Sequence, residues 1–378
     1  MTDRYLGLPL EYWQPEFLGV PQPLWIFAFT ALGLIVGSFL NVVIHRLPAG
    51  ASVVTPPSHC PHCQTRIPLR FNLPVISWLA LRGRCAFCHA AIPVRYLLVE
   101  VLTGALFLAN WLVFGHDQPW MAVALCVLFA GFIAATFIDL EHLIIPDEIT
   151  LGGAAAGFLL SAAVPALQGA SDPMTAMKRS ALGMAAGAGL VYAVLRLGKL
   201  AFGRHRMTLP EGSEVLFLES GLVLPSGEMP YGEIFYRPSD AVRLHARRVE
   251  LADRCYRDCE VEVLLAAHPA VLRIGGEEFR AEEEPYLRVE TRRIELPREA
   301  MGLGDVKFMA AIGAFLGWQA AVFSLFASAI LGTVVAVLLI ATGRQTLSGR
   351  LGYGPYIAAA AMIWVYGGNE FARRWLGL

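Results

Sequence analysis

Residues 120–139 read WMAVALCVLFAGFIAATFID, and this stretch decides the class of fold. Nineteen uncharged, mostly apolar residues precede Asp139, which is enough helix to cross the hydrocarbon core of a bilayer. A carboxylate at membrane depth is costly and therefore favours a functional interpretation. A second carboxylate, Asp305, follows Gly302-Leu303-Gly304 at the edge of another apolar run. The sequence thus predicts an acid and a base that share one site in a membrane protein.

The composition supports membrane embedding. Of 378 residues, 56% are hydrophobic and 16% charged, whereas soluble domains carry about 25% charged residues. The net charge of −1 gives no argument for nucleic-acid binding. Residues 1–23 lack a basic n-region and an Ala-x-Ala site, so we expect no cleaved signal peptide.

The expected fold is an all-α polytopic membrane protein of about eight transmembrane helices, with a cytoplasmic zinc-knuckle loop and a β-rich soluble insert. The expected spans are 24–44, 96–114, 120–138, 149–167, 181–202, 299–317, 320–342 and 352–368. The expected divisions are an N-terminal part with the first helix (1–44), the zinc loop (45–95), helices two to five (96–203), the insert (204–298) and helices six to eight (299–378).

Arginine distribution predicts the orientation. The loop 45–95 holds six arginines and residues 1–23 hold one, which favours a cytoplasmic loop and an external N-terminus. Arg344 and Arg350 agree with this assignment, whereas Arg373 and Arg374 disagree. Both aspartates then lie at the cytoplasmic rim.

The insert carries 33 of the 61 Asp, Glu, Lys and Arg residues between Arg204 and Glu299, which makes it too polar to span a bilayer. Four short runs with Pro and Gly between them favour β-strands: 215–218, 233–236, 261–264 and 287–290. Cys255 and Cys259 could pair or bind metal, and we interpret them as incidental.

Two Cys-x-x-Cys pairs predict a metal site. Cys60 with Cys63 and Cys85 with Cys88 have the separation expected of four thiolates around a structural zinc ion. A disulfide is disfavoured in the reducing cytoplasm. The neighbouring histidines are interpreted as bystanders: His59, His62 and His89. Four thiolates leave no open coordination position, so the metal is expected to be structural.

The local sequence around each of three aspartates indicates a different role for each. Asp139 faces the negative end of its helix dipole, which is unfavourable for a residue that serves solubility alone. Asp147 follows Pro146 and is predicted to be an N-cap. Asp305 could itself be a cap, but Gly302 and Gly304 permit close backbone approach or an unusual dihedral beside it.

Two carboxylates at short range share one proton, which creates a general acid and a general base. We expect Asp139 to carry the proton and Asp305 to be the anion near a helix N-terminus. The matching reaction is attack of activated water on a peptide carbonyl, with protonation of the leaving amine.

Four segments in order resemble the type IV prepilin leader peptidases, a family of membrane aspartic proteases with a Gly-x-Gly-Asp motif. These segments are residues 37–48 (GSFLNVVIHRLP) followed by the cysteine pairs, 137–147 (FIDLEHLIIPD), 300–307 (AMGLGDVK) and 352–356 (GYGPY). The resemblance implies an endopeptidase of the bacterial inner membrane that cleaves the short basic leader of prepilins or pseudopilins after Gly, on the cytoplasmic side. It assigns Asp139 and Asp305 as the catalytic pair, with Asp147 in the same pattern.

Many members of that family also methylate the new N-terminus with S-adenosylmethionine, an activity that here rests on the resemblance alone. The chain departs from the family in that 165 residues separate the aspartates, most of the excess being the insert. Alternatives are a presenilin-like protease, which the cysteine pairs disfavour, and an ion-coupled transporter, which gives no reason for a zinc loop.

Overall fold

The computed structural model describes residues 4–5, 8–9, 18–202, 204–218, 221–225, 227–235, 240–251, 253–265, 270–281, 284, 286–297, 302–343 and 351–375. Contacts divide the chain into two compact units. The first, residues 1–192 with 303–378, contains the helical bundle, and the second, residues 193–302, contains a β-sheet.

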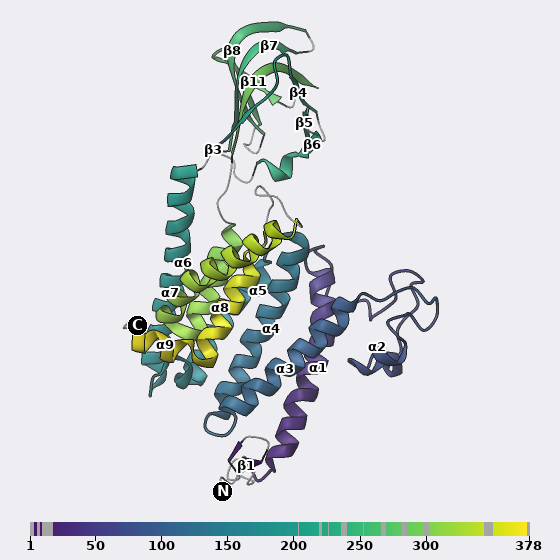
Figure 1. The fold of residues 1–378 in the computed structure, drawn as a ribbon, viewed down its shortest axis with the longest axis vertical. Coiled ribbons are helices and arrows are strands. Elements are labelled where there is room, and N and C mark those ends of the chain that lie inside the picture. Colours follow the sequence, from purple (N-terminus) through teal and green to yellow (C-terminus); the bar gives the residue numbers. More distant parts are fainter. Residues whose placement is uncertain are drawn as a thin grey trace. The chain divides into compact units, whose positions relative to one another are not determined.

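The bundle is built from long apolar helices and short connecting ones (Figure 1). The α-helices are α1 (Gln22–Arg46), α2 (Ile76–Ala80), α3 (Val94–Phe114), α4 (Pro119–His142), α5 (Asp147–Ala163), α6 (Pro173–Phe202), α7 (Leu303–Ala341), α8 (Gly354–Ile363) and α9 (Asn369–Trp375). Shorter elements are the 3-10 helices η2 (Leu69–Phe71), η3 (Pro165–Gln168) and η4 (Tyr231–Glu233), and the π-helical turn η6 (Trp364–Gly368). A two-stranded ribbon, β1 (Arg4–Tyr5) with β2 (Leu8–Pro9), precedes them.

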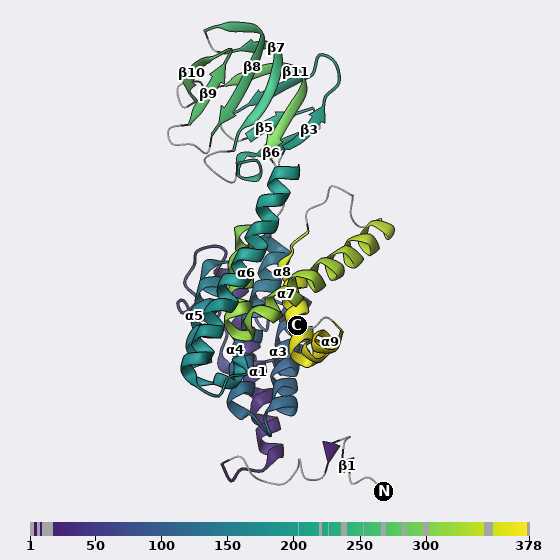
Figure 2. The same ribbon diagram turned by 90° about the vertical axis from the view of Figure 1, so that its left-hand side faces the viewer.

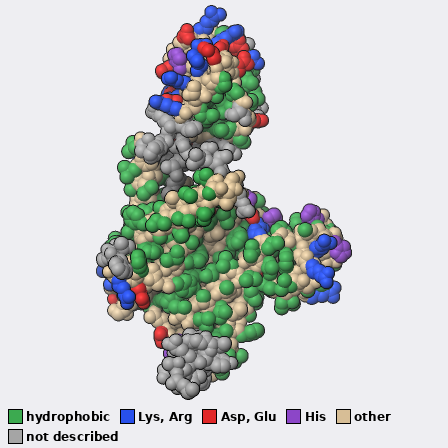
Figure 3. Space-filling model, viewed as in Figure 1, with side chains coloured by type: hydrophobic (Ala, Val, Ile, Leu, Met, Phe, Trp, Pro, Cys, Tyr) green, Lys and Arg blue, Asp and Glu red, His purple; other side chains and the backbone are tan. Residues whose placement is uncertain are grey.

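Each of the eight expected spans coincides with helix in the described residues. Within the described ranges, five helices are long and apolar enough to cross a membrane: α1, α3, α4, the part of α6 from Pro173 to Gly198, and α7. The expected spans 299–317 and 320–342 are joined in α7, which is kinked at Gly317. The face of the bundle seen in Figure 3 is mostly hydrophobic. Large apolar side chains of the bundle are exposed, among them Phe27, Phe326 and Ile330. The chain is therefore a membrane protein.

Glycines allow α6 and α7 to touch backbone to backbone. A Cβ on Gly183 would lie 2.1 Å from the carbonyl oxygen of Gly313, and a Cβ on Gly313 would lie 2.0 Å from that of Gly183. No side chain fits at either position. Close approach through small residues is how membrane helices gain packing contacts.

The kink in α7 is held by polar side chains from neighbouring elements. Gly317 has φ +83, which a residue with a Cβ rarely adopts. The carbonyl oxygen of Ala314, one turn earlier, accepts hydrogen bonds from the side chains of Ser161, Gln168 and Ser180 at 3.1, 2.7 and 2.8 Å. These donors fix α5, η3 and α6 against the bend.

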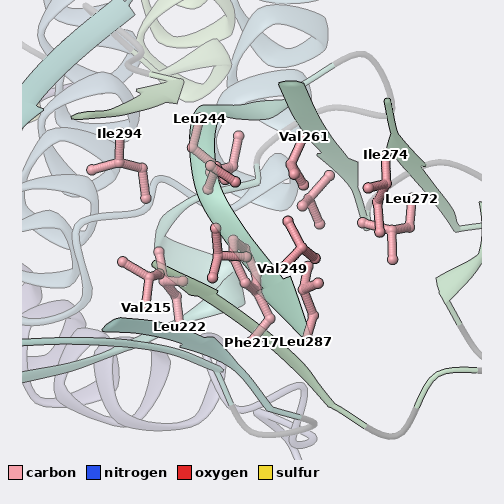
Figure 4. Packing of buried hydrophobic residues seen from close by; sticks show 14 of the residues in the cluster. Val215, Phe217, Leu222, Leu244, Val249, Val261, Leu272, Ile274, Leu287 and Ile294 are labelled. Carbon is pink, nitrogen blue, oxygen red and sulfur yellow. The ribbon is translucent and has the colours of Figure 1, made fainter. Parts of the chain in front are cut away.

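The insert is one antiparallel sheet (Figure 2). Its strands are β3 (Arg204–Thr208), β4 (Glu214–Phe217), β5 (Gly221–Leu224), β6 (Gly227–Pro230), β7 (Val242–Glu250), β8 (Cys255–Leu264), β9 (Val271–Ile274), β10 (Glu277–Arg280) and β11 (Leu287–Pro297). Their order is β10-β9-β8-β7-β11-β4-β5-β6, with β3 also paired to β11. Inward side chains such as Val249, Leu272 and Ile294 fill a dedicated core (Figure 4).

The strand expectations are mostly confirmed. The runs 215–218, 261–264 and 287–290 fall on β4, β8 and β11. The run 233–236 is wrong over its described part, because η4 ends at Glu233 and Ile234 follows in a turn. Ile234 is nevertheless buried, so its apolar character serves the core without a strand. Tyr236 lies outside the described residues.

Candidate active site

Asp139 is buried in the last turn of α4. Its side chain is 5% exposed, and its Oδ2 accepts a hydrogen bond of 2.7 Å from the backbone N–H of Gly354. The helix ends at His142, where Leu143 takes a left-handed conformation and donates its N–H to the Asp139 carbonyl. The aspartate is therefore fixed at both its backbone and its carboxylate.

The segment before α8 closes over Asp139. A Cβ on Gly352 would lie 2.7 Å from Asp139 Oδ2 and 2.8 Å from the Asp139 carbonyl oxygen, and a Cβ on Gly354 would lie 3.0 Å from the same Oδ2. Only glycine permits this approach at Gly352. Reasoning from the residues alone did not place this segment at the site, although its two glycines followed by Pro355 were visible in the sequence.

Asp305 is buried in the first turn of α7. Its side chain is 8% exposed. Three residues into a helix, it lies where the N-terminal end of the helix dipole favours an anion. Gly302 is exposed just outside the helix. Gly304 is helical, so the unusual dihedral is absent there. A Cβ on Gly304 would make only ordinary contact with Ile145, at 3.4 Å.

Ile145 links the two aspartate segments. It packs against Gly304, the neighbour of Asp305, and its Cδ1 would lie 3.1 Å from a Cβ on Gly354, the residue that binds Asp139. Below this layer, Phe132 of α4 and Phe308 of α7 stack edge to face with centroids 5.6 Å apart. Both aspartates therefore lie at one end of the bundle, around the same loop.

Two tyrosines of the segment 352–356, here called the closing segment, also lie near the two aspartates. The Tyr353 hydroxyl, 3.0 Å from Ser328 Oγ, is within electrostatic reach of Asp305. The Tyr356 hydroxyl is within electrostatic reach of Asp139. The segment 352–356 thus contacts Asp139 and lies near Asp305.

The N-cap expectation for Asp147 is wrong. Pro146 occupies the cap position with no side-chain capping bond, and Asp147 is the first residue of α5. Its carboxylate instead binds the ammonium of Lys307, with N–O distances of 2.6 and 2.8 Å. Asp147 is still favourably placed for the α5 dipole, and the ion pair ties the start of α5 to the start of α7.

The four cysteines form one cluster. The Sγ atoms of Cys60, Cys63, Cys85 and Cys88 all lie within 4.8 Å of one another, and those of Cys60 and Cys88 are 3.7 Å apart. A tetrahedral site with metal–sulfur bonds of about 2.3 Å has sulfur–sulfur edges of about 3.8 Å. The donor set therefore fits a tetrahedral thiolate-bound metal ion.

The two Cys-x-x-Cys turns share one backbone hydrogen-bond pattern. In each, the carbonyl oxygen of the first cysteine accepts a hydrogen bond from the N–H of the fourth residue after it (Gln64 or His89), and that residue has positive φ. Hydrogen bonding with the Thr65 side chain and backbone lowers the pKa of Cys63 to about 6. This favours the thiolate that a metal requires.

The remaining histidines and cysteines stay outside the cluster. Among the described residues, the metal-binding group consists of the four cysteines, so His59, His62 and His89 are not part of it. Cys255 and Cys259 are four positions apart on β8, a separation of about 13 Å along a strand. They cannot form a disulfide with each other.

The chain matches two family models in the segments that build the site. Residues 31–114 match the bacterial peptidase A24 N-terminal domain, and residues 126–204 with 293–337 match the type IV leader peptidase family. The first segment holds the cysteine cluster, and the second holds both aspartates.

Characterised proteins agree with these matches. A prepilin leader peptidase/N-methyltransferase of Myxococcus xanthus is 45% identical over 39% of this chain and 42% of its own length. A type 4 prepilin-like proteins leader peptide-processing enzyme of Escherichia coli is 45% identical over 32% of this chain and 52% of its own length. These two matches thus cover about half of the relatives' length. A prepilin leader peptidase/N-methyltransferase of Aeromonas hydrophila is 26% identical over 98% of this chain and 96% of its own. No solved structure matches the chain significantly.

The segments that build this bundle, with its two buried aspartates and its four clustered cysteines, match models of a peptidase family, which defines the class of protein. The chain is a member of the type IV leader peptidase family.

Proposed function

We propose that this protein is a membrane aspartic endopeptidase that removes the short basic leader of type IV prepilins or pseudopilins, with Asp139 and Asp305 as its catalytic pair. The observation that carries the proposal is the burial of both carboxylates at one end of the bundle, around the loop that holds Ile145. Membership of the family supplies the substrate class.

The two carboxylates have environments suited to different roles. Asp305 lies in the first turn of α7, where the helix dipole favours its anionic form as the general base. Asp139 accepts the Gly354 N–H on Oδ2, so its other oxygen is available to hold a proton as the general acid. Like charges at short range favour exactly one shared proton.

The reaction follows from these roles. Asp305 takes a proton from a water molecule, whose oxygen attacks the scissile carbonyl carbon. Asp139 then gives its proton to the leaving amine as the C–N bond breaks. The carboxylates act through water, so no covalent intermediate forms on the enzyme.

The test uses detergent-purified protein and a peptide that contains a prepilin leader. We expect Asp139→Asn and Asp305→Asn each to lower kcat/KM by about 10²-fold or more, because each removes a proton-transfer group. Asp147→Asn is the matched control, a nearby acid with an ion-pair role, and is expected to retain cleavage. If all three variants cleave the peptide as fast as the unsubstituted protein, Asp139 and Asp305 are not the catalytic pair. Activity that required an ion gradient would favour a transporter.

We propose that the cysteine cluster holds a structural zinc ion. Cys60, Cys63, Cys85 and Cys88 would supply four thiolates, and the bound metal would fix the loop without taking part in the reaction. S-adenosylmethionine-dependent methylation of the new N-terminus is a second proposed activity, supported by the names of the relatives. The test supplies the Asp139→Asn variant with a pre-cleaved peptide and a labelled methyl donor. Transfer of the label to the peptide would demonstrate the methyltransferase activity independently of proteolysis.

We further propose that the protein resides in the bacterial inner membrane with eight transmembrane helices and the site at the cytoplasmic face. The arginines of the loop 45–95 support this orientation. Arg344 and Arg350, which agree with it in sequence, lie outside the described residues. Cleavage of a leader peptide by inside-out but not right-side-out vesicles would test the assignment.

A further inference from the structure

The segment 47–93 of the zinc loop (45–95) carries a net positive charge. No Asp or Glu occurs between residues 45 and 99. Its arginines Arg66, Arg70, Arg82 and Arg84 are exposed, and in the described part of the chain no carboxylate pairs with them. A divalent metal ion on four thiolates carries a net charge of −2, so the four arginines leave the segment with a net charge of about +2, carried on its exposed side chains.

The same loop exposes large apolar side chains. Ile76 and Leu79 lie three residues apart on α2, share one helix face and are 64 and 57% exposed. Leu73, in the bend before α2, is 50% exposed. Leu69 in η2 is 86% exposed. We call these four residues the apolar stripe.

A partly buried hydrogen bond holds the start of α2 against α3. The Val75 N–H donates to Glu100 Oε2 at 2.7 Å, and Glu100 lies five residues, about 7.5 Å, further along α3 than Arg95. Arg95 pairs with Glu141 at the start of α3 and so marks the polar end of that helix. The start of α2 is therefore held alongside the membrane-spanning helix, below its polar end.

The turn at this point is strained. Val75 has φ 63 and ψ −52, and the N–H of Ile76 bonds to the carbonyl of Pro74 two residues earlier, which defines a γ-turn. A β-branched residue in this conformation is costly, so the surroundings must over-determine it. Ile76 and Leu79, which follow this turn, are exposed.

The loop extends sideways from the bundle. Figure 1 shows the α2 segment beside the ends of α1 and α3, displaced from the bundle instead of continuing along the helix axes. Where such a projection lies at the depth of the bilayer, lipid occupies the space beside the membrane-spanning helices. Figure 3 shows blue and purple side chains gathered over this projection together with green ones.

We propose that the zinc loop docks on the anionic phospholipid surface of its own bilayer, with the apolar stripe in the boundary between headgroups and acyl chains and the exposed arginines on lipid phosphates. Interfacial segments insert about 5–10 Å at this boundary, which matches the depth at which Glu100 holds α2. Unpaired arginines without local acids complement anionic headgroups. This inference is independent of the peptidase activity.

The test places a genetically encoded fluorescent amino acid at Leu79 of the full-length, zinc-containing protein. The protein is reconstituted into vesicles of phosphatidylcholine with phosphatidylglycerol, in which the acyl chains of one lipid or the other are brominated. Bromine at the boundary is expected to reduce the emission roughly twofold or more, while aqueous iodide has little effect. Brominated phosphatidylglycerol should quench more strongly than the same fraction of brominated phosphatidylcholine.

Charge variants show whether the arginines cause this preference. Combined Arg70→Gln and Arg82→Gln should abolish the preference for phosphatidylglycerol, and the matched Arg70→Lys and Arg82→Lys pair should keep it, because lysine retains the charge. Three results would overturn the proposal: quenching by iodide but not by brominated lipid, equal quenching by the two lipids in the parent protein, or protection of the label only when a prepilin peptide is added. The last would assign the surface to the protein substrate.

Discussion

Replacement of Gly352 by alanine is the sharpest test of how Asp139 is held. The new Cβ would lie 2.7 Å from Asp139 Oδ2, and a normal contact needs about 3.4 Å. The carboxylate or the closing segment must therefore move by about 0.7 Å. The Asp139 carbonyl oxygen, 2.8 Å away, blocks the other direction because it is bonded to the N–H of Leu143.

A displacement of this size should act mainly on catalysis. Misplacement of a catalytic group by about 1 Å costs on the order of 10²-fold in rate. Overpacking of a closed site costs about 1–3 kcal/mol in stability. We therefore expect Gly352→Ala to lower kcat/KM about 10- to 100-fold while the bundle stays folded.

A graded series controls for the presence of an extra methyl group. Gly354→Ala brings its Cβ to 3.0 Å from the same oxygen and 3.1 Å from the flexible Cδ1 of Ile145, so a smaller loss is expected. Gly131→Ala, on the same helix as Asp139, meets no atom within 4 Å and should cleave normally. The assay is peptide cleavage by purified variants whose thermal unfolding has been checked. If folded Gly352→Ala cleaves as fast as Gly131→Ala, the closing segment does not position Asp139.

Three further predictions concern the metal, the helix packing and the ion pair. Cys60→Ser removes one of four thiolates, so metal analysis should find the purified protein depleted of zinc; full zinc occupancy would contradict a four-thiolate site. Gly183→Ala would place a Cβ 2.1 Å from a carbonyl oxygen of α7 and should destabilise the protein by about 3 kcal/mol, measured as a lower unfolding temperature in detergent. Gly189→Ala on the same helix has open space and serves as its control. Lys307→Met breaks a partly exposed pair with Asp147 and should cost at most about 1 kcal/mol, with kcat/KM changed only a few-fold; a loss as large as that of a catalytic aspartate would give Lys307 a direct role.

Local sequence patterns predicted the features that depend on nearby residues. The apolar runs predicted the helices, and the cysteine spacing predicted a cluster whose sulfur atoms do meet. The carboxylates Asp139 and Asp305 were singled out because charge beside an apolar run is costly, and both prove to be buried. Each of these inferences needed only a window of a few tens of residues.

Features that depend on contacts between residues far apart in the sequence could not be predicted from local patterns. Asp147 has the local signature of an N-cap, but Lys307, 160 positions away, binds its carboxylate. The closing of Gly354 over Asp139 joins residues 215 apart. The run beginning at Glu233 has strand-like composition, yet Pro230 and Gly232 favour the turn that places Ile234 in the core. In the first two cases a tertiary contact prevailed over local propensity, and in the third the neighbouring turn residues prevailed over strand-like composition.

The insert can interrupt the catalytic sequence because each unit has its own core. The match to the type IV leader peptidase family stops at residue 204 and resumes at 293, and the sheet occupies that interval. The sheet is filled by its own side chains, including Val249 and Leu272, and does not borrow bundle residues for its core. Within the bundle, Gly183 and Gly313 bring α6 and α7 into backbone contact, so the two helices that flank the insert in sequence are joined to each other. Because Asp305 lies in the first turn of α7, that contact fixes the position of the aspartate independently of the length of the connection.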